Sequence, residues 1–76
     1  MATIIHLYYK GEFEDLTVLV QIDPESLRGL ELVIDTDNNI QKTKRIFDAT
    51  IYDDLAADDF KESSALEFNL YLKGFK

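Results

Sequence analysis

Alternating apolar and polar residues mark the first half of the chain as a series of short β-strands. Residues 3–10 (TIIHLYYK) and 16–23 (LTVLVQID) are rich in β-branched and aromatic residues, and the link GEFED between them has a length found in hairpins. After the turn-forming segment DPESLRG, residues 30–36 (LELVIDT) predict a third strand. Residues 40–47 (IQKTKRIF) alternate poorly and carry three bases, which suits an edge strand.

The second half of the chain predicts one helix and one further strand. Residues 49–63 (ATIYDDLAADDFKES) place apolar residues at helical spacing, and Thr50 with Asp53 matches a capping box in which Asp replaces the usual Glu. Residues 64–75 (SALEFNLYLKGF) alternate apolar and polar without a break from Leu66 to Lys73. We therefore predict a last strand there, with one buried and one wet face.

Together these elements predict a small α+β domain that spans residues 1–76. In sequence order they are strand, strand, turn, strand, strand, helix and strand. This order gives an antiparallel or mixed sheet of four to five strands with one short helix packed on one face. The opening hairpin and the length are similar to those of the ubiquitin-like β-grasp fold. That fold has a long helix after its second strand, however, and PESLRG is too short for one.

Composition narrows the range of functions. The chain has no cysteine, which excludes disulfide and thiolate chemistry, and its single histidine leaves few routes to a transition-metal site. The net charge of −7 argues against direct nucleic-acid binding. No apolar run approaches the roughly 18 residues that a membrane span needs, and the start lacks the pattern of a secretory signal. We therefore expect a cytoplasmic protein that uses no cofactor and does not bind membranes.

Two motifs that could carry chemistry have simpler interpretations. Asp35, Asp37 and Asn39 stand at the first, third and fifth positions of a calcium loop, but isoleucine replaces both its glycine and its bidentate glutamate. A plain hairpin turn is favoured there. His6 lies mid-strand, and no nucleophile or carboxylate is tied to it by spacing, which favours a packing or surface role. The sequence predicts no metal site and no catalytic residue.

Residues 53–60 (DDLAADDF) concentrate negative charge on the predicted helix. At about 100° per residue the carboxylates fan out around the helix, except that Asp59 falls near the centre of its apolar face. Burying an unpaired carboxylate is costly, so either Asp59 pairs with a Lys or Arg, or the face is not fully buried, or the helix ends near Ala57, which we expect. This acidic stretch is either a solvated face or a docking surface for a basic partner. Its candidate partner-binding residues are Asp53, Asp54, Asp58 and Glu62.

The face of the predicted sheet that points away from the helix carries more apolar residues than a solvated face needs. Either a terminus or loop covers this face, or it is exposed, as we expect, and an exposed apolar patch that includes aromatic residues usually marks an interface. Its candidate partner-binding residues are Ile4, His6, Tyr8, Leu19, Val33 and Tyr71.

Our leading hypothesis is a non-enzymatic interaction module, adaptor or regulator, that docks through this sheet face onto another protein or onto a second copy to form a homodimer. The alternative is an inhibitor or decoy whose carboxylates mimic nucleic-acid phosphates and block a basic protein groove. An enzyme is a weaker third hypothesis, because no nucleophile, base and cleft can be assembled from the spacing of the residues.

Overall fold

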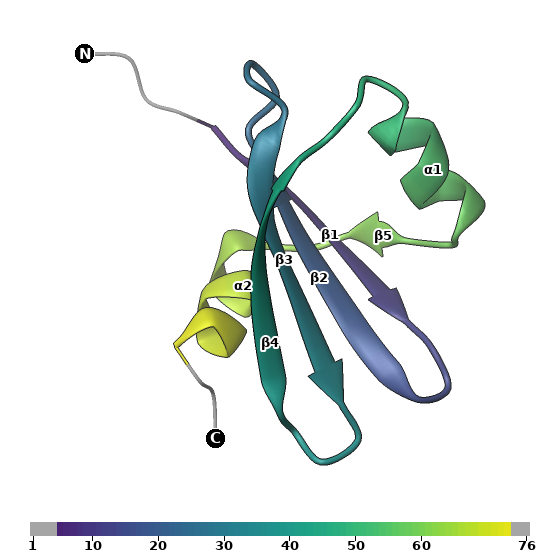
Figure 1. Ribbon diagram of the computed structural model, residues 1–76, viewed down its shortest axis with the longest axis vertical. Coiled ribbons are helices and arrows are strands. Elements are labelled where there is room, and N and C mark those ends of the chain that lie inside the picture. Colours follow the sequence, from purple (N-terminus) through teal and green to yellow (C-terminus); the bar gives the residue numbers. More distant parts are fainter. Residues whose placement is uncertain (1–4, 74–76) are drawn as a thin grey trace.

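A five-stranded antiparallel sheet with one helix on each face makes up the computed structural model, which describes residues 5–73 (Figure 1). The order across the sheet is β4-β3-β2-β1-β5. The predicted α+β class is confirmed. Within residues 5–73, no helix is long and apolar enough to cross a membrane. The elements are β1 (Leu7–Glu12), β2 (Leu16–Ile22), β3 (Arg28–Asp35), β4 (Ile40–Ile46), α1 (Ile51–Ala57), β5 (Lys61–Glu62) and α2 (Ala65–Leu72).

The first four strands are confirmed with shifted ends. Gly11 lies inside β1, beyond the predicted end of the first strand, and pairs with Val18 in the hairpin with β2. Gly29 lies inside β3, where a Cβ atom would clash with the carbonyl oxygen of Gln21. The turn itself ends at Leu27, whose φ of 59° puts it in the left-handed region.

Helix α1 lies within the predicted segment, but its predicted capping box is wrong. Thr50 has φ −78° and ψ −2°, which is a helical conformation, and its side chain makes no capping hydrogen bond. A capping side chain reaches the first-turn N–H groups from an extended residue, so the backbone of Thr50 directs its hydroxyl elsewhere. The end of the helix is confirmed: α1 stops at Ala57.

The predicted last strand is wrong, because most of that segment forms helix α2. Ser64 is extended, with φ −112° and ψ 156°, and its Oγ accepts a hydrogen bond from the backbone N–H of Glu67 at 3.1 Å. The helix turns Phe68 fully into the sheet and leaves Leu66 72% exposed. The strand that follows α1 is instead β5, which pairs with β1 through two residues.

Two apolar clusters lie on opposite faces of the sheet. They are separate because successive side chains of β2 point to opposite faces. Under α1 the buried residues are Val18, Val20, Ile22, Phe47 and Leu55. Under α2 they are Leu19, Leu32, Ile34 and Phe68.

We predict that Phe68→Ala destabilises the fold strongly, whereas Leu66→Ala does not. Loss of the fully buried Phe68 ring should cost about 3–5 kcal/mol, and loss of the exposed Leu66 side chain should stay within about 0.5 kcal/mol. Urea unfolding measures both, and Phe68→Leu provides a milder change if the alanine variant does not fold. Equal losses at both positions would instead support a strand, in which the two side chains share a face.

Candidate functional site

The predicted sheet-face patch is not an exposed surface, because α2 covers it. Leu19 has no solvent-exposed area and lies in one cluster with Phe68. Tyr8 and Tyr71 are half-buried and pack against the same cluster, and the ring centroids of Tyr8 and Phe68 are 5.4 Å apart. These residues form the inner side of a helix-sheet contact. The expectation of an exposed apolar face is therefore wrong for them.

Of the other patch residues, Val33 lies on the opposite face of the sheet and His6 lies at its margin. Val33 pairs with Val18 and packs on the α1 side of the sheet, so it lies on the opposite face. His6 is half-buried just before β1, with its ring tilted against that of Tyr8 at a centroid distance of 6.4 Å. Ile4 lies outside the described residues.

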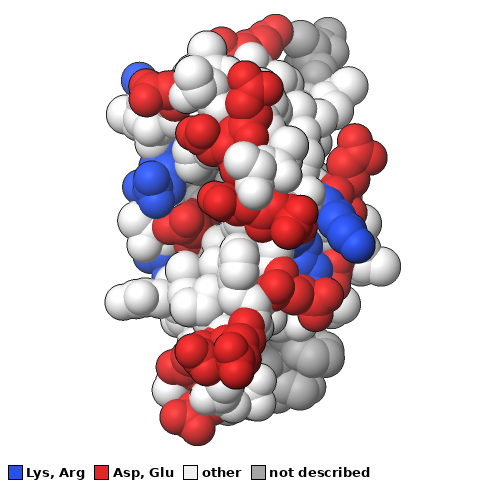
Figure 2. All heavy atoms as spheres, turned by 90° about the vertical axis from the view of Figure 1, so that its right-hand side faces the viewer, with Lys and Arg blue, Asp and Glu red and all other residues white. Residues whose placement is uncertain are grey.

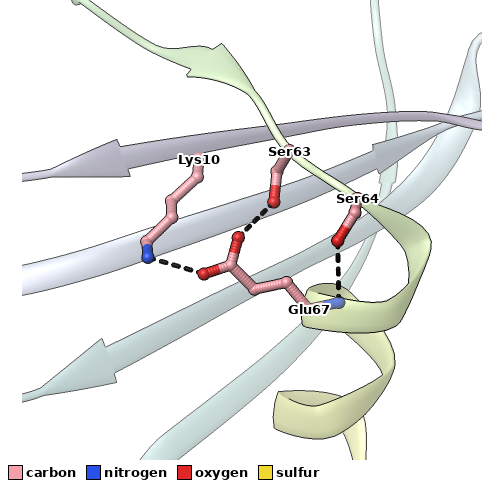
Figure 3. A network of polar contacts seen from close by, with 4 residues as sticks. All are labelled: Lys10, Ser63, Ser64 and Glu67. Carbon is pink, nitrogen blue, oxygen red and sulfur yellow. Dashed lines mark hydrogen bonds and ion pairs between the residues drawn. The ribbon is translucent and has the colours of Figure 1, made fainter.

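A network of polar contacts ties α2 to strand β1 (Figure 3). Lys10 Nζ lies 2.7 Å from Glu67 Oε2, and the hydroxyl of Ser63 donates to Glu67 Oε1. The hydrogen bond from Lys10, followed by that from Ser63, holds the pKa of the Glu67 carboxyl below its usual value. The same hydrogen bond raises the pKa of Lys10, although partial burial of the ammonium opposes this shift. The network therefore orients the first turn of α2 over the sheet.

The predicted acidic residues are all exposed and belong to one larger surface. Figure 2 views the side of the molecule that carries α1, β5 and the β1–β2 loop, and acidic side chains run along its length. We define the acidic surface as the exposed carboxylates of these three elements and of the ends of β1 and α1; it comprises Asp53, Asp54, Asp58 and Glu62, together with Glu12, Glu14, Asp15 and Asp59.

The end of α1 is built so that Asp59 points into solvent instead of the core. The N–H of Asp59 donates to the carbonyl of Ala56 at 3.2 Å, and the N–H of Phe60 donates to that of Leu55 at 2.9 Å. Together with the φ of 61° at Asp59, these bonds form a Schellman motif. Asp59 therefore takes the left-handed position that glycine usually occupies. This turn resolves the conflict that the helical pattern posed for a buried Asp59.

An aromatic pair lies among these acids. Phe13 in the β1–β2 loop and Phe60 after α1 meet edge to face with ring centroids 5.7 Å apart, and Phe13 is 45% exposed. Gly11 makes room for the pair, because a Cβ there would lie 2.8 Å from the Phe60 ring. Sequence reasoning missed this pair. The signal was a phenylalanine inside the acidic loop GEFED.

A hollow of about 540 Å³ is lined by Lys10, Glu12, Asp59, Lys61 and Glu62, from strands β1 and β5 and the end of α1. Two ammonium groups there face three carboxylates, so this hollow is less suited to a cation than the surrounding surface. Within residues 5–73, no three His, Cys, Asp or Glu side chains are grouped so that they could hold a metal ion.

The segment that resembles a calcium loop is a tight turn between β3 and β4. One carboxylate oxygen of Asp35 accepts hydrogen bonds from the N–H groups of Asp37 and Asn39, at 2.9 and 3.0 Å. These bonds, the Asn39 one first, lower the pKa of Asp35. Asn38 adopts a left-handed φ of 64°. The predicted hairpin turn is confirmed, and Asp35 is used to hold its backbone.

No known protein family, curated protein or solved structure matches the chain. The acidic surface and the aromatic pair within it are therefore the observations from which a function has to be inferred.

We predict that the Lys10–Glu67 coupling energy weakens in acid. Glu67 has a lowered pKa in the folded state, so its contribution is present above its usual pKa of 4.5 and is lost as pH falls through the folded value. The contribution of Lys10, whose pKa is raised, is complete below its usual 10.5 and does not change in this range. A double-mutant cycle with Lys10→Met and Glu67→Gln should give about 1 kcal/mol at pH 7 and less at pH 3. A coupling energy that is equal at both pH values would contradict the ion pair.

We also predict that Asp59→Gly stabilises the protein by about 0.5–1 kcal/mol, because glycine adopts the left-handed conformation at lower cost. Asp58→Gly is the matched control, because this substitution removes an equal charge from a residue whose φ of −94° lies outside the left-handed region. Thermal or urea unfolding should show a gain for Asp59→Gly alone. A similar gain for both variants would point to relief of charge repulsion instead of backbone strain.

Proposed function

We propose that this protein is a non-enzymatic interaction module that binds a basic partner protein through its acidic surface. The observation that carries the proposal is the Phe13–Phe60 ring pair, in which Phe13 is 45% exposed and both rings have exposed carboxylates as sequence neighbours. The leading hypothesis from the sequence is retained as a class of function, but the docking surface moves. Docking through the sheet face is not proposed, since Leu19 is buried beneath α2.

The charges of the acidic surface support a basic partner. Within residues 5–73 the ion pairs are Lys10–Glu67 and Arg45–Glu31, so no carboxylate of the acidic surface has an ion-pair partner there. The carboxylates of the acidic surface outnumber the two ammonium groups of the neighbouring hollow, Lys10 and Lys61, so the excess negative charge is repulsive and a basic protein surface would relieve this repulsion. Clustered charge of one sign also accelerates the association of an oppositely charged partner.

The aromatic pair supplies the apolar contact that a charged surface lacks. Binding energy at protein interfaces is concentrated in a few large side chains that become buried and are surrounded by polar residues. Phe13 offers such a side chain. Arginine is the partner residue that fits best, because its guanidinium stacks on aromatic rings and pairs with carboxylates.

Mimicry of nucleic-acid phosphates is the second candidate function. It is favoured by the acidic side chains that follow the length of one side of the molecule (Figure 2). In this case the basic partner would be a nucleic-acid-binding protein, and DNA or RNA would compete for the same groove.

Capture experiments from a lysate of the native host test this proposal. We predict that the immobilised protein retains a basic protein, that Asp53→Asn with Asp58→Asn reduces its retention, and that Phe13→Ala does the same. The control is Glu25→Gln with Asp37→Asn, which removes equal charge from exposed positions outside the acidic surface. With the partner in hand, the Asn variant should slow association and flatten its salt dependence, whereas Phe13→Ala should speed dissociation about tenfold or more.

Equal retention by the acidic-surface variant and by its control would contradict the proposal. Displacement of the captured protein by duplex DNA or by RNA would select phosphate mimicry over ordinary docking.

A further inference from the structure

The outer edge of strand β4 is open. Strand β4 ends the sheet, and no strand within residues 5–73 pairs with its outer side. Its residues are exposed except for the half-buried Ile40. An open edge strand offers unpaired backbone N–H and C=O groups to any extended chain that can lie beside it.

The register shows which backbone groups face outward. Phe47 N–H bonds to the Leu27 carbonyl at 2.7 Å, and Asp35 N–H bonds to the Asn39 carbonyl at 3.1 Å, which marks hydrogen-bonded pairs at both ends of the β3–β4 ladder. Such pairs alternate along antiparallel strands. The outward groups therefore belong to the positions between them, which are Ile40, Lys42, Lys44 and Ile46.

The side chains at these four positions share one face of the sheet, the face that α2 covers farther in. Two lysines stand between two isoleucines, and Ile46 is 76% exposed. Neither Lys42 nor Lys44 forms an ion pair within residues 5–73. Arg45, on the other face, is already paired with Glu31 at 2.9 Å.

A second copy of the chain is a poor occupant of this edge. Antiparallel pairing of two β4 strands about Thr43 would place Lys42 of one copy opposite Lys44 of the other. Like charges directly opposite each other destabilise a strand pair. Lysines on an edge strand thus discourage self-pairing, but they favour a strand whose facing residues are acidic.

We propose that the edge of β4 accepts an extended acidic segment of a partner protein as a sixth strand. Its acids would alternate to face Lys42 and Lys44, with apolar residues opposite Ile40 and Ile46. This site is independent of the acidic surface, because β4 and β5 lie at opposite ends of the strand order. A protein with both sites would bridge a basic partner and an acidic one.

A symmetric peptide tests the edge directly. The probe is Val-Thr-Glu-Thr-Glu-Thr-Val, blocked at both ends, so that it fits in either direction; the control peptide has Lys in place of Glu. Amide hydrogen exchange followed by NMR should show Thr43 and Arg45 protected in the free protein. Addition of the Glu peptide should slow exchange at Lys42 and Lys44 about tenfold or more, and the Lys peptide should not.

Variants of the protein distinguish specific pairing of the peptide with Lys42 and Lys44 from general attraction to positive charges elsewhere on the protein. Lys42→Gln with Lys44→Gln should weaken binding of the Glu peptide about tenfold, whereas Lys61→Gln with Lys73→Gln, an equal change of charge elsewhere, should weaken it less than twofold. The proposal is overturned if the Glu peptide does not bind at millimolar concentration, if it protects other amides, or if both variants behave alike. Concentration-dependent protection of Lys42 and Lys44 without peptide, together with a doubled mass, would assign the edge to a second copy instead.

Discussion

The rest of the structure depends on the burial of strand β2 on both of its faces. Val18, Leu19 and Val20 are consecutive, point alternately to opposite sides of the sheet, and are all at most 9% exposed. Because water must be excluded from both sides, a sheet built around this strand needs two covers. Helices α1 and α2 are these covers. Each is short, but Leu55 and Phe68 place one large apolar side chain in each of the two clusters.

This constraint moves the candidate functions from the faces of the sheet to its sides. Because α2 lies on the second face of the sheet, the apolar residues of that face are buried and stabilise the fold. The Lys10–Glu67 ion pair holds the first turn of α2 in place. The acidic surface and the edge of β4 remain open to a partner. They carry opposite charges and lie at opposite ends of the strand order, so that two partners could bind at once without competing for the same residues.

Strand positions could be predicted because alternation of apolar and polar residues over a short segment is typical of a strand, and the first three strands follow it. Strand β4 alternates poorly and was predicted instead from its bases, which suit an edge strand. Helix α2 could not be predicted from alternation, since Leu66 and Leu70 complete the strand pattern but are exposed. The clue to α2 was Ser64 followed three residues later by Glu67, which is the spacing of a capping box. Of the two hydrogen bonds of that motif, the structure forms the one from the backbone N–H of Glu67 to Ser64 Oγ. The face of the sheet on which Val33 lies was predicted wrongly for another reason. The turn at Leu27 determines which residues of β3 point to which face, and no local sequence pattern reveals this.

The carboxylates of α1 in the acidic surface could be predicted from the sequence, because the helical spacing of Asp53, Asp54 and Asp58 places them in solvent. The aromatic pair could not be predicted, because Phe13 and Phe60 are far apart in the sequence and meet only where the β1–β2 loop folds against the end of α1. The prediction of an exposed patch on the sheet face was wrong for the same reason as the predicted last strand. The segment that was assigned to the sheet is helix α2, which covers this face.

The central claim is that α2 covers the second face of the sheet, and nuclear Overhauser contacts of the Phe68 ring test it most directly. The structure predicts contacts from this ring to the side chains of Leu19 and Leu32, together with sequential amide-amide contacts through residues 65–72 that are typical of a helix. Cross-strand contacts between Cα protons of residues 65–72 and those of a neighbouring strand, without contacts from Phe68 to Leu19, would contradict it.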